Sequence, residues 1–283
     1  MITQSVNIVD LHTHSNFSDG SLSPTELVRH AGEVGLKALA LTDHDCIDGI
    51  PSAINAARQL GIILIPGVEL NSFQETEIHI LGYFSEDNYE NMKEFLSKAV
   101  AERIIRNRKI IDKLASLGIR VSFDEVSIEA GKEVFMRSHI ASVLVKKGYV
   151  SDIGKAFSHY LAVGKKAYVK KEFPTADLCV SAIKHAGGIP VLAHPVQIKL
   201  KLRKLRKTVA ALIESGLAGI EAYYSTNTVA DTENYLGLAR DFDLIATGGS
   251  DFHGDYKKHV LLGSGNGNLV IPDSVLDNVL SRL

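Results

Sequence analysis

Histidines and carboxylates recur along this 283-residue chain at the points where short apolar runs end. His12 and His14 flank one threonine, and Asp251 and His253 flank one phenylalanine. Because side chains on a strand alternate between its two faces, each pair projects to one side and can grip one ion. The candidate ligands are His12, His14, Asp19, His44, Glu69, His79, His194, Asp251 and His253. This pattern predicts a metal centre with hydrolytic chemistry.

The elements that must position these side chains are short apolar strands separated by helices. Strands are predicted near residues 6–12, 37–43, 62–68, 77–83, 189–193, 219–223 and 244–248. Ser23 is expected to cap a helix that ends near Gly35, and a second helix runs from Asp48 to Leu60. Two further helices are predicted over 175–186 and 202–215. The alternation predicts parallel β/α units, and a closed barrel is favoured because the ligands must converge from nearly every strand.

One stretch breaks this alternation. Residues 88–171 contain helical patterns over 90–117, 137–147 and 152–161 and no strand that leads to a candidate ligand. We therefore expect a barrel domain formed by 1–87 and 172–283 and a helical insertion subdomain, 88–171, that caps the pocket and selects the substrate.

The composition of the chain limits its class, its cellular location and its binding partners. Hydrophobic residues make up 45% of the chain, which supports a substantial core, and no run approaches about 18 apolar residues, so we expect no membrane segment. No signal peptide is evident at the amino terminus, and a cytoplasmic location is expected. The two cysteines form no CxxC pair, so neither a disulfide framework nor a thiolate zinc site is expected. A formal net charge of -2 argues against affinity for long duplex nucleic acid but is compatible with a nucleotide or a short RNA.

The candidate ligands lie in an ordered series of motifs. These are DLHTH at 10–14, SDG at 18–20, LTDHD at 41–45, PGVE at 66–69, IHILG at 78–82, LAHP at 192–195 and GSDFH at 249–253. The series resembles the motifs of the PHP phosphoesterase family, the polymerase and histidinol phosphatase type, across essentially the whole chain. Within that family the chain is most similar to stand-alone bacterial nucleotide phosphatases and a 5'-3' exoribonuclease.

The resemblance implies a distorted, seven-stranded TIM-like (β/α)7 barrel that holds two to three divalent ions. It implies that His12, His14 and Asp251 hold the first ion, and that Glu69 bridges it to a second ion held by His79 and His194. Asp19, His44 and His253 would hold the third ion. Glu69, His194 and Asp251 would be the catalytic residues. Imidazole and carboxylate ligands without thiolate favour Mn, Fe or Zn.

The resemblance also extends to substrate contacts in the insertion. Arg137 is expected to clamp a substrate phosphate, Lys165 to provide a point charge, and His139 to contact the substrate or protonate the leaving group. Asp43 and Asp45 flank His44 and are expected to orient ligands. Where many relatives carry Gly after Ala-His-Pro, this chain carries Val196-Gln197, so its substrate preference can differ. The basic run 199–207 is read as an exposed helix, with steering of an anionic substrate as the alternative.

Three functions remain open. The leading one is hydrolysis of phosphate monoesters of nucleotides, either a nucleoside 3',5'-bisphosphate or a 5'-nucleotide. The second is a 5'-3' exoribonuclease acting on short 5'-phosphorylated RNA. The third is a histidinol-phosphatase-like or non-catalytic module, and a non-catalytic module would lack ligands, whereas all the expected positions are filled.

Overall fold

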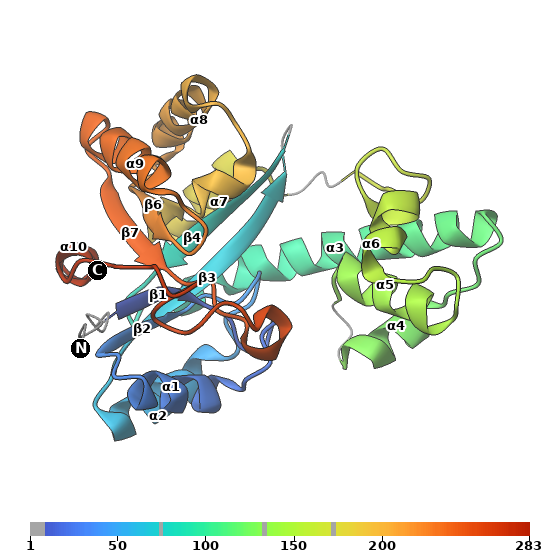
Figure 1. Cartoon of the computed structure of the whole chain (residues 1–283), viewed down its shortest axis with the longest axis horizontal. Helices are drawn as coiled ribbons and strands as arrows, with labels where there is room; N and C mark the ends of the chain where they lie inside the picture. Colours follow the sequence, from blue (N-terminus) through green and yellow to red (C-terminus); the bar gives the residue numbers. More distant parts are fainter. Residues whose placement is uncertain (1–8, 74–75, 132–134, 171–173) are drawn as a thin grey trace. The chain divides into compact units, whose positions relative to one another are not determined.

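A computed structural model of the chain describes residues 9–73, 76–131, 135–170 and 174–283 and divides into two compact units. The first unit comprises Met1–Phe95 and Pro174–Leu283, and the second comprises Leu96–Phe173. The boundary falls inside helix α3 (Lys93–Ser116). The strands belong to the first unit, whereas the second is helical (Figure 1).

The first unit is built on one seven-stranded sheet whose strands follow one another in chain order. They are β1 (Val9–Thr13), β2 (Ala38–Leu41), β3 (Ile63–Phe73), β4 (Glu77–Tyr83), β5 (Ile189–Leu192), β6 (Gly219–Tyr224) and β7 (Ile245–Gly249). The segment after β7 returns to β1, where His14 N donates to Phe252 O and Asp251 N donates to His12 O, each over 2.9 Å. The sheet therefore forms the nearly closed barrel that the sequence predicts; residues 6–8 of the first predicted strand lie outside the described residues.

The prediction of parallel units is wrong for β4. Pairing is parallel from β1 to β3 and from β5 to β7, but β4 is antiparallel to both of its neighbours. Only three residues separate Phe73 from Glu77, and a parallel crossover needs a dozen or more, so the chain must reverse direction. This hairpin pairs Glu69 with Leu81 and Asn71 with His79, so His79 lies diagonally across from Glu69.

Most helices of the first unit begin and end where the sequence predicts. Helix α1 (Pro24–Glu33) starts with a capping box between Ser23 and Glu26, and α2 (Ile50–Leu60) ends at Gly61, whose φ is 68°. Helices α7 (Ala176–His185) and α8 (Leu202–Ser215) also match the prediction. The described part of this unit also contains two helices that were not predicted, α9 (Val229–Asp241) and α10 (Ser274–Leu280). Figure 1 shows α9 beside β6 and β7.

The second unit has its own hydrophobic core. Besides α3 it contains α4 (Phe123–Ala130), α5 (Arg137–Lys146), α6 (Ile153–Ala156) and the helical turn η2 (Phe157–Leu161). Buried residues from these elements include Ile110, Leu114, Val126, Phe135, Ile140, Leu144 and Leu161. No helix in the described part of the chain combines the length and apolar character needed to cross a membrane.

A buried carboxylate fastens the ends of the barrel together. Asp10 on β1 accepts hydrogen bonds from Ser250 N and Gly263 N, both over 2.8 Å. Burial raises the pKa of this carboxyl, although these bonds act in the opposite direction. Asp10 thus holds the segment after β7 in place beside His12, on which the site depends.

Gly249 is the point of closest approach between β7 and β1. A Cβ added to Gly249 would overlap the backbone nitrogen and the Cβ of His12. We expect Gly249→Ala to lower the free energy of unfolding by about 1–3 kcal/mol, as overpacking does, measured by urea unfolding. The matched control is Gly237→Ala in α9, where the added Cβ meets nothing closer than 3.9 Å and about 0.5–1 kcal/mol of stabilisation is expected. Equal stability of the two variants would contradict the close approach.

Candidate metal centre

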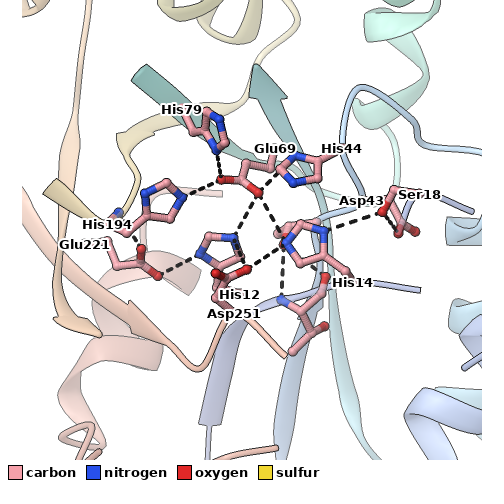
Figure 2. A network of polar contacts seen from close by, with 12 residues as sticks. His12, His14, Ser18, Asp43, His44, Glu69, His79, His194, Glu221 and Asp251 are labelled. Carbon is pink, nitrogen blue, oxygen red and sulfur yellow. Dashed lines mark hydrogen bonds and ion pairs between the residues drawn. The ribbon is translucent and has the colours of Figure 1, made fainter. Parts of the chain in front are cut away.

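Glu69 lies at the centre of the site and faces five imidazoles. Its Oε1 lies 2.8 Å from His79 Nδ1 and 2.7 Å from His194 Nε2. Its Oε2 lies 3.2 Å from each of His12 Nε2, His14 Nε2 and His44 Nδ1. Figure 2 shows these rings converging on the one carboxylate. Strands β1, β3 and β4 and the segments after β1, β2 and β5 therefore deliver donor atoms to one point.

Asp251 and Asp19 extend the cluster on the side of His14. Asp251 Oδ1 lies 3.3 Å from His14 Nε2, 3.4 Å from His253 Nδ1 and 3.7 Å from His12 Nε2. Asp19 Oδ1 lies 3.3 Å from His253 Nε2. All the predicted ligands are thus brought into one connected cluster, and Asp251 links its two sides.

The donor atoms form three groups, each within 4.8 Å, that could hold an ion. These are His12, His14, Glu69 and Asp251; His14, Asp19, His44 and His253; and His44, Glu69 and His79. The grouping resembles the predicted ligand sets but shares His14 and His44 between groups. His194 belongs to none of these three groups but contacts Glu69, which is in two of them.

The chemistry of the cluster fits divalent metal ions. Among the described residues, several buried atoms of the cluster have no hydrogen-bond partner: His12 Nε2, His14 Nε2, Asp19 Oδ1, Glu69 Oε2, His79 Nε2 and His194 Nδ1. A buried polar atom without a partner costs free energy, so this concentration of such atoms in one place indicates a cation site. Imidazole nitrogens and carboxylate oxygens without thiolate are the donors that Mn, Fe and Zn accept.

Electrostatics within the cluster keep its central carboxylate ionised. Burial alone would raise the pKa of Glu69, but the imidazoles of His44, His12 and His79 lower it well below its ordinary range. Burial also opposes the charged form of His12, yet the carboxylates of Glu221 and Glu69 raise the pKa of that imidazole well above its usual value. For His44, burial outweighs the nearby carboxylates and lowers the pKa to about 3. Glu69 therefore presents a negative charge at neutral pH.

The sequence analysis missed Glu221, a fully buried carboxylate on β6. Its Oε1 lies 2.9 Å from His12 Nδ1, and its Oε2 accepts a hydrogen bond from His194 N over 2.6 Å. Because Nδ1 of His12 must donate to this carboxylate, the lone pair of the neutral ring lies on Nε2, which faces Glu69. The second bond holds the backbone of His194, whose φ of 25° is unusual for a residue other than glycine. Glu221 thus orients two predicted ligands.

Tyr224, also on β6, supports Asp251. Its hydroxyl donates to Asp251 Oδ2 over 2.8 Å, and Lys257 Nζ donates to the same oxygen over 2.9 Å. These two donors occupy Oδ2 and leave Oδ1 facing the histidines. Gln197, one of the two residues at which this chain departs from the family pattern, donates from its side-chain amide to the Tyr224 hydroxyl.

A bulge in β6 explains how both residues reach the site. Glu221 pairs with Thr247 and Tyr223 pairs with Gly248, so Ala222 is the extra residue. In a regular strand Glu221 and Tyr224 would face opposite sides, and the extra residue brings them to the same side. A capping signal or hydrophobic period does not reveal such a bulge, which is why sequence reasoning assigned β6 no functional residue.

Asp43 and Asp45 act on the ligands indirectly. Asp43 accepts hydrogen bonds from the Ser15 and Ser18 hydroxyls, both over 2.6 Å. Asp45 accepts from Asn71 N and Asn71 Nδ2, and the same Nδ2 lies 3.2 Å from His44 Nδ1. Asn71 is therefore the residue that joins Asp45 to a predicted ligand.

The predicted substrate contacts belong to the second unit. Arg137 begins α5, donates to Leu161 O over 3.2 Å and lies 5.8 Å from the centre of the Phe157 ring. His139 Nδ1 accepts from Met136 N over 3.0 Å, so its Nε2 carries the proton in the neutral ring. Lys165 is exposed. Their contact with a substrate stays a prediction.

Comparison with known proteins gives consistent matches. The PHP domain model matches residues 10–170. A 5'-3' exoribonuclease of Haemophilus influenzae is 40% identical over 245 residues, which cover 86% of this chain and 89% of the relative. A 3',5'-nucleoside bisphosphate phosphatase of Chromobacterium violaceum is 33% identical over 247 residues, which cover 87% of each chain.

Solved structures agree with the sequence matches. An amidohydrolase from Chromobacterium violaceum, solved with bound sulfate and without metal, superposes with a TM-score of 0.81 at 30% identity. A candidate metal-dependent phosphoesterase from Bifidobacterium adolescentis gives a TM-score of 0.80 at 28% identity. Each match covers 97% of this chain and 96% of the other. The chain therefore belongs to the PHP domain family of metal-dependent phosphoesterases.

Proposed function

We propose that this enzyme hydrolyses phosphate monoesters of nucleotides at a centre of two to three divalent ions. The observation that carries the proposal is the buried Glu69 carboxylate surrounded by five imidazoles. The proposed ligands are His12, His14, Asp19, His44, Glu69, His79, His194, Asp251 and His253, with Mn, Fe or Zn as the metal.

The protein's own residues prepare the site for this chemistry. When bound, neighbouring divalent ions lower the pKa of water and stabilise charge on the phosphoryl oxygens. Glu69 directs Oε1 toward His79 and His194 and Oε2 toward the other three imidazoles, so it would contribute to more than one ligand group if ions were bound. His194 is held through its backbone by Glu221, and Asp251 is held through Oδ2 by Tyr224 and Lys257. These bonds fix the donor atoms before substrate arrives, so little reorganisation accompanies the reaction.

We propose that Arg137, His139 and Lys165 contact the phosphate and the leaving group. The solved structure from Chromobacterium violaceum contains bound sulfate, a tetrahedral anion like phosphate. We expect Arg137→Met to raise KM for a nucleotide about 10- to 100-fold, since a hydrogen bond to a charged group contributes about 1.5–3 kcal/mol. Metal content, measured by mass spectrometry, should be unchanged. The control is Arg120→Met, an exposed arginine of the same unit. Loss of metal from Arg137→Met, or an unchanged KM, would contradict this role.

A second candidate activity is 5'-3' exoribonuclease cleavage of short RNA. Two relatives of this chain favour this activity, one from Haemophilus influenzae at 40% identity and one from Escherichia coli at 34% identity. Both are named 5'-3' exoribonucleases. Product analysis with adenosine 3',5'-bisphosphate, AMP and a short 5'-phosphorylated RNA separates the two activities. Phosphate release from the mononucleotides alone identifies the phosphatase, whereas stepwise release of mononucleotides from the RNA identifies the exonuclease. No turnover of any of the three would contradict both.

A further inference from the structure

The net charge of the whole chain is near neutral, but its two units carry net charges of opposite sign. Leu96–Phe173 contains sixteen lysines and arginines but eight aspartates and glutamates. The other unit holds the remaining 15 basic and 25 acidic residues of the 31 and 33 in the chain. Part of the acidic surplus lies in the metal centre, where bound cations would offset it.

Part of this positive charge gathers where the segment after η2 packs on α3. Lys113 Nζ donates to Tyr168 O over 2.7 Å, and Arg106 Nε donates to Val169 O over 2.9 Å. Lys109 lies between these two on the same helical face, and Lys166 and Lys170 flank the bonded residues. We term this set the α3 basic face: Arg106, Lys109, Lys113, Lys166 and Lys170.

The lysines of the α3 basic face keep their charge uncompensated. Lys109, Lys113, Lys166 and Lys170 are all exposed, and within the described residues none of them forms an ion pair. Two other lysines of the unit differ, since Lys146 pairs with Glu129 and Lys147 pairs with Glu125. A Lys113 bound to a carbonyl oxygen retains its full positive charge and two further donors.

The spacing and chemistry of the α3 basic face fit a single nucleic-acid strand. Arg106, Lys109 and Lys113 recur at about 5 Å along the helix axis, which lets neighbouring cations meet successive phosphates. Tyr168 adds an aromatic ring, 5.9 Å from the Arg106 guanidinium, and a base can stack on such a ring. A nucleic-acid strand supplies both regularly spaced phosphates and a base beside each of them, which matches a row of cations next to an aromatic ring.

We infer that the α3 basic face binds the backbone of a short single-stranded RNA. The inference rests on the second candidate activity of the proposed function, cleavage of short RNA at the same metal centre, and it names the surface that would hold the RNA strand. It adds a binding surface in the helical unit beyond the proposed phosphate contacts, and Lys165 lies next to it, since Tyr168 N donates to Lys165 O over 3.0 Å.

The test measures binding without catalysis. Fluorescence anisotropy of a 3'-labelled, 5'-phosphorylated RNA of about 12 nucleotides is recorded in EDTA over a range of salt concentrations. The triple variant Lys113→Met, Lys166→Met, Lys170→Met should bind at least tenfold more weakly. The slope of log affinity against log salt should fall by about 0.7 for each phosphate that the variant no longer neutralises. The matched control, Lys201→Met, Lys204→Met, Lys207→Met, removes equal charge from the start of α8 and should bind like the unaltered enzyme.

Several outcomes would overturn the inference. The first is that the Lys113 triple variant and the unaltered enzyme have equal affinities and equal salt slopes. The second is that both triple variants bind RNA equally weakly, and the third is that the unaltered enzyme binds no RNA. The fourth is that polyglutamate competes for the enzyme as effectively as unlabelled RNA does. Hydrolysis of adenosine 3',5'-bisphosphate by the metal-loaded enzyme is measured in parallel and should be the same in the Lys113 triple variant. Failure of hydrolysis in the unaltered enzyme would instead reject the proposed function, so the two failures are distinguishable.

Discussion

Glu69→Gln is expected to abolish phosphoester hydrolysis, with a loss on the order of 10³-fold or more. The amide has nearly the shape of the carboxylate but lacks its charge, and it would face five imidazoles with one oxygen instead of two. Losing about 4 kcal/mol of transition-state stabilisation gives a loss of this size. We expect the variant to retain less metal than the unaltered enzyme, as measured by mass spectrometry after loading with Mn.

The control for this variant is Glu214→Gln, an exposed glutamate of α8. It should keep the activity and metal content of the unaltered enzyme. Circular dichroism of the metal-free proteins checks that Glu69→Gln still folds. A folded Glu69→Gln variant with full metal content and full turnover would refute the central place of Glu69.

Glu221→Gln is expected to weaken metal binding about 10- to 100-fold, although Glu221 is not itself a predicted ligand. The amide oxygen would accept from His194 N, which leaves the NH2 group facing His12 Nδ1. That nitrogen would then have to accept a hydrogen bond, and the proton would move to Nε2, the atom that faces Glu69. His12 Nε2 would then carry a proton and could no longer donate its lone pair to a metal ion.

Two measurements test this effect separately from turnover. Metal titration gives the change in affinity, and the ¹⁵N chemical shifts of His12 in the metal-free protein report which ring nitrogen carries the proton. Glu233→Gln, on the exposed side of α9, is the matched control. An unchanged metal affinity together with an unchanged His12 spectrum would show that Glu221 does not position the ring.

The sequence predicted the candidate ligands because most of them follow or lie within an apolar strand, and strands of a barrel converge. It could not predict the orientation of β4, since hydrophobic periodicity is the same for parallel and antiparallel pairing; the short Phe73–Glu77 connection held that information. Glu221 was missed because its role depends on an extra residue in β6 and on neighbours far away in sequence. Helix α9 could have been found, because Thr228 and Asp231 form a capping box.

Measurement of phosphate release from adenosine 3',5'-bisphosphate before and after metal removal tests the central claim most directly. The enzyme is stripped with a chelator, its metal content is determined, and Mn, Fe(II) or Zn is returned stepwise while activity is followed. We predict no turnover without metal and full recovery of turnover once two to three ions are bound per chain. The Glu69→Gln variant should bind fewer ions per chain under the same conditions. Equal turnover by the stripped enzyme, or a stripped enzyme that takes up no metal, would contradict a metal-dependent phosphoesterase built around Glu69.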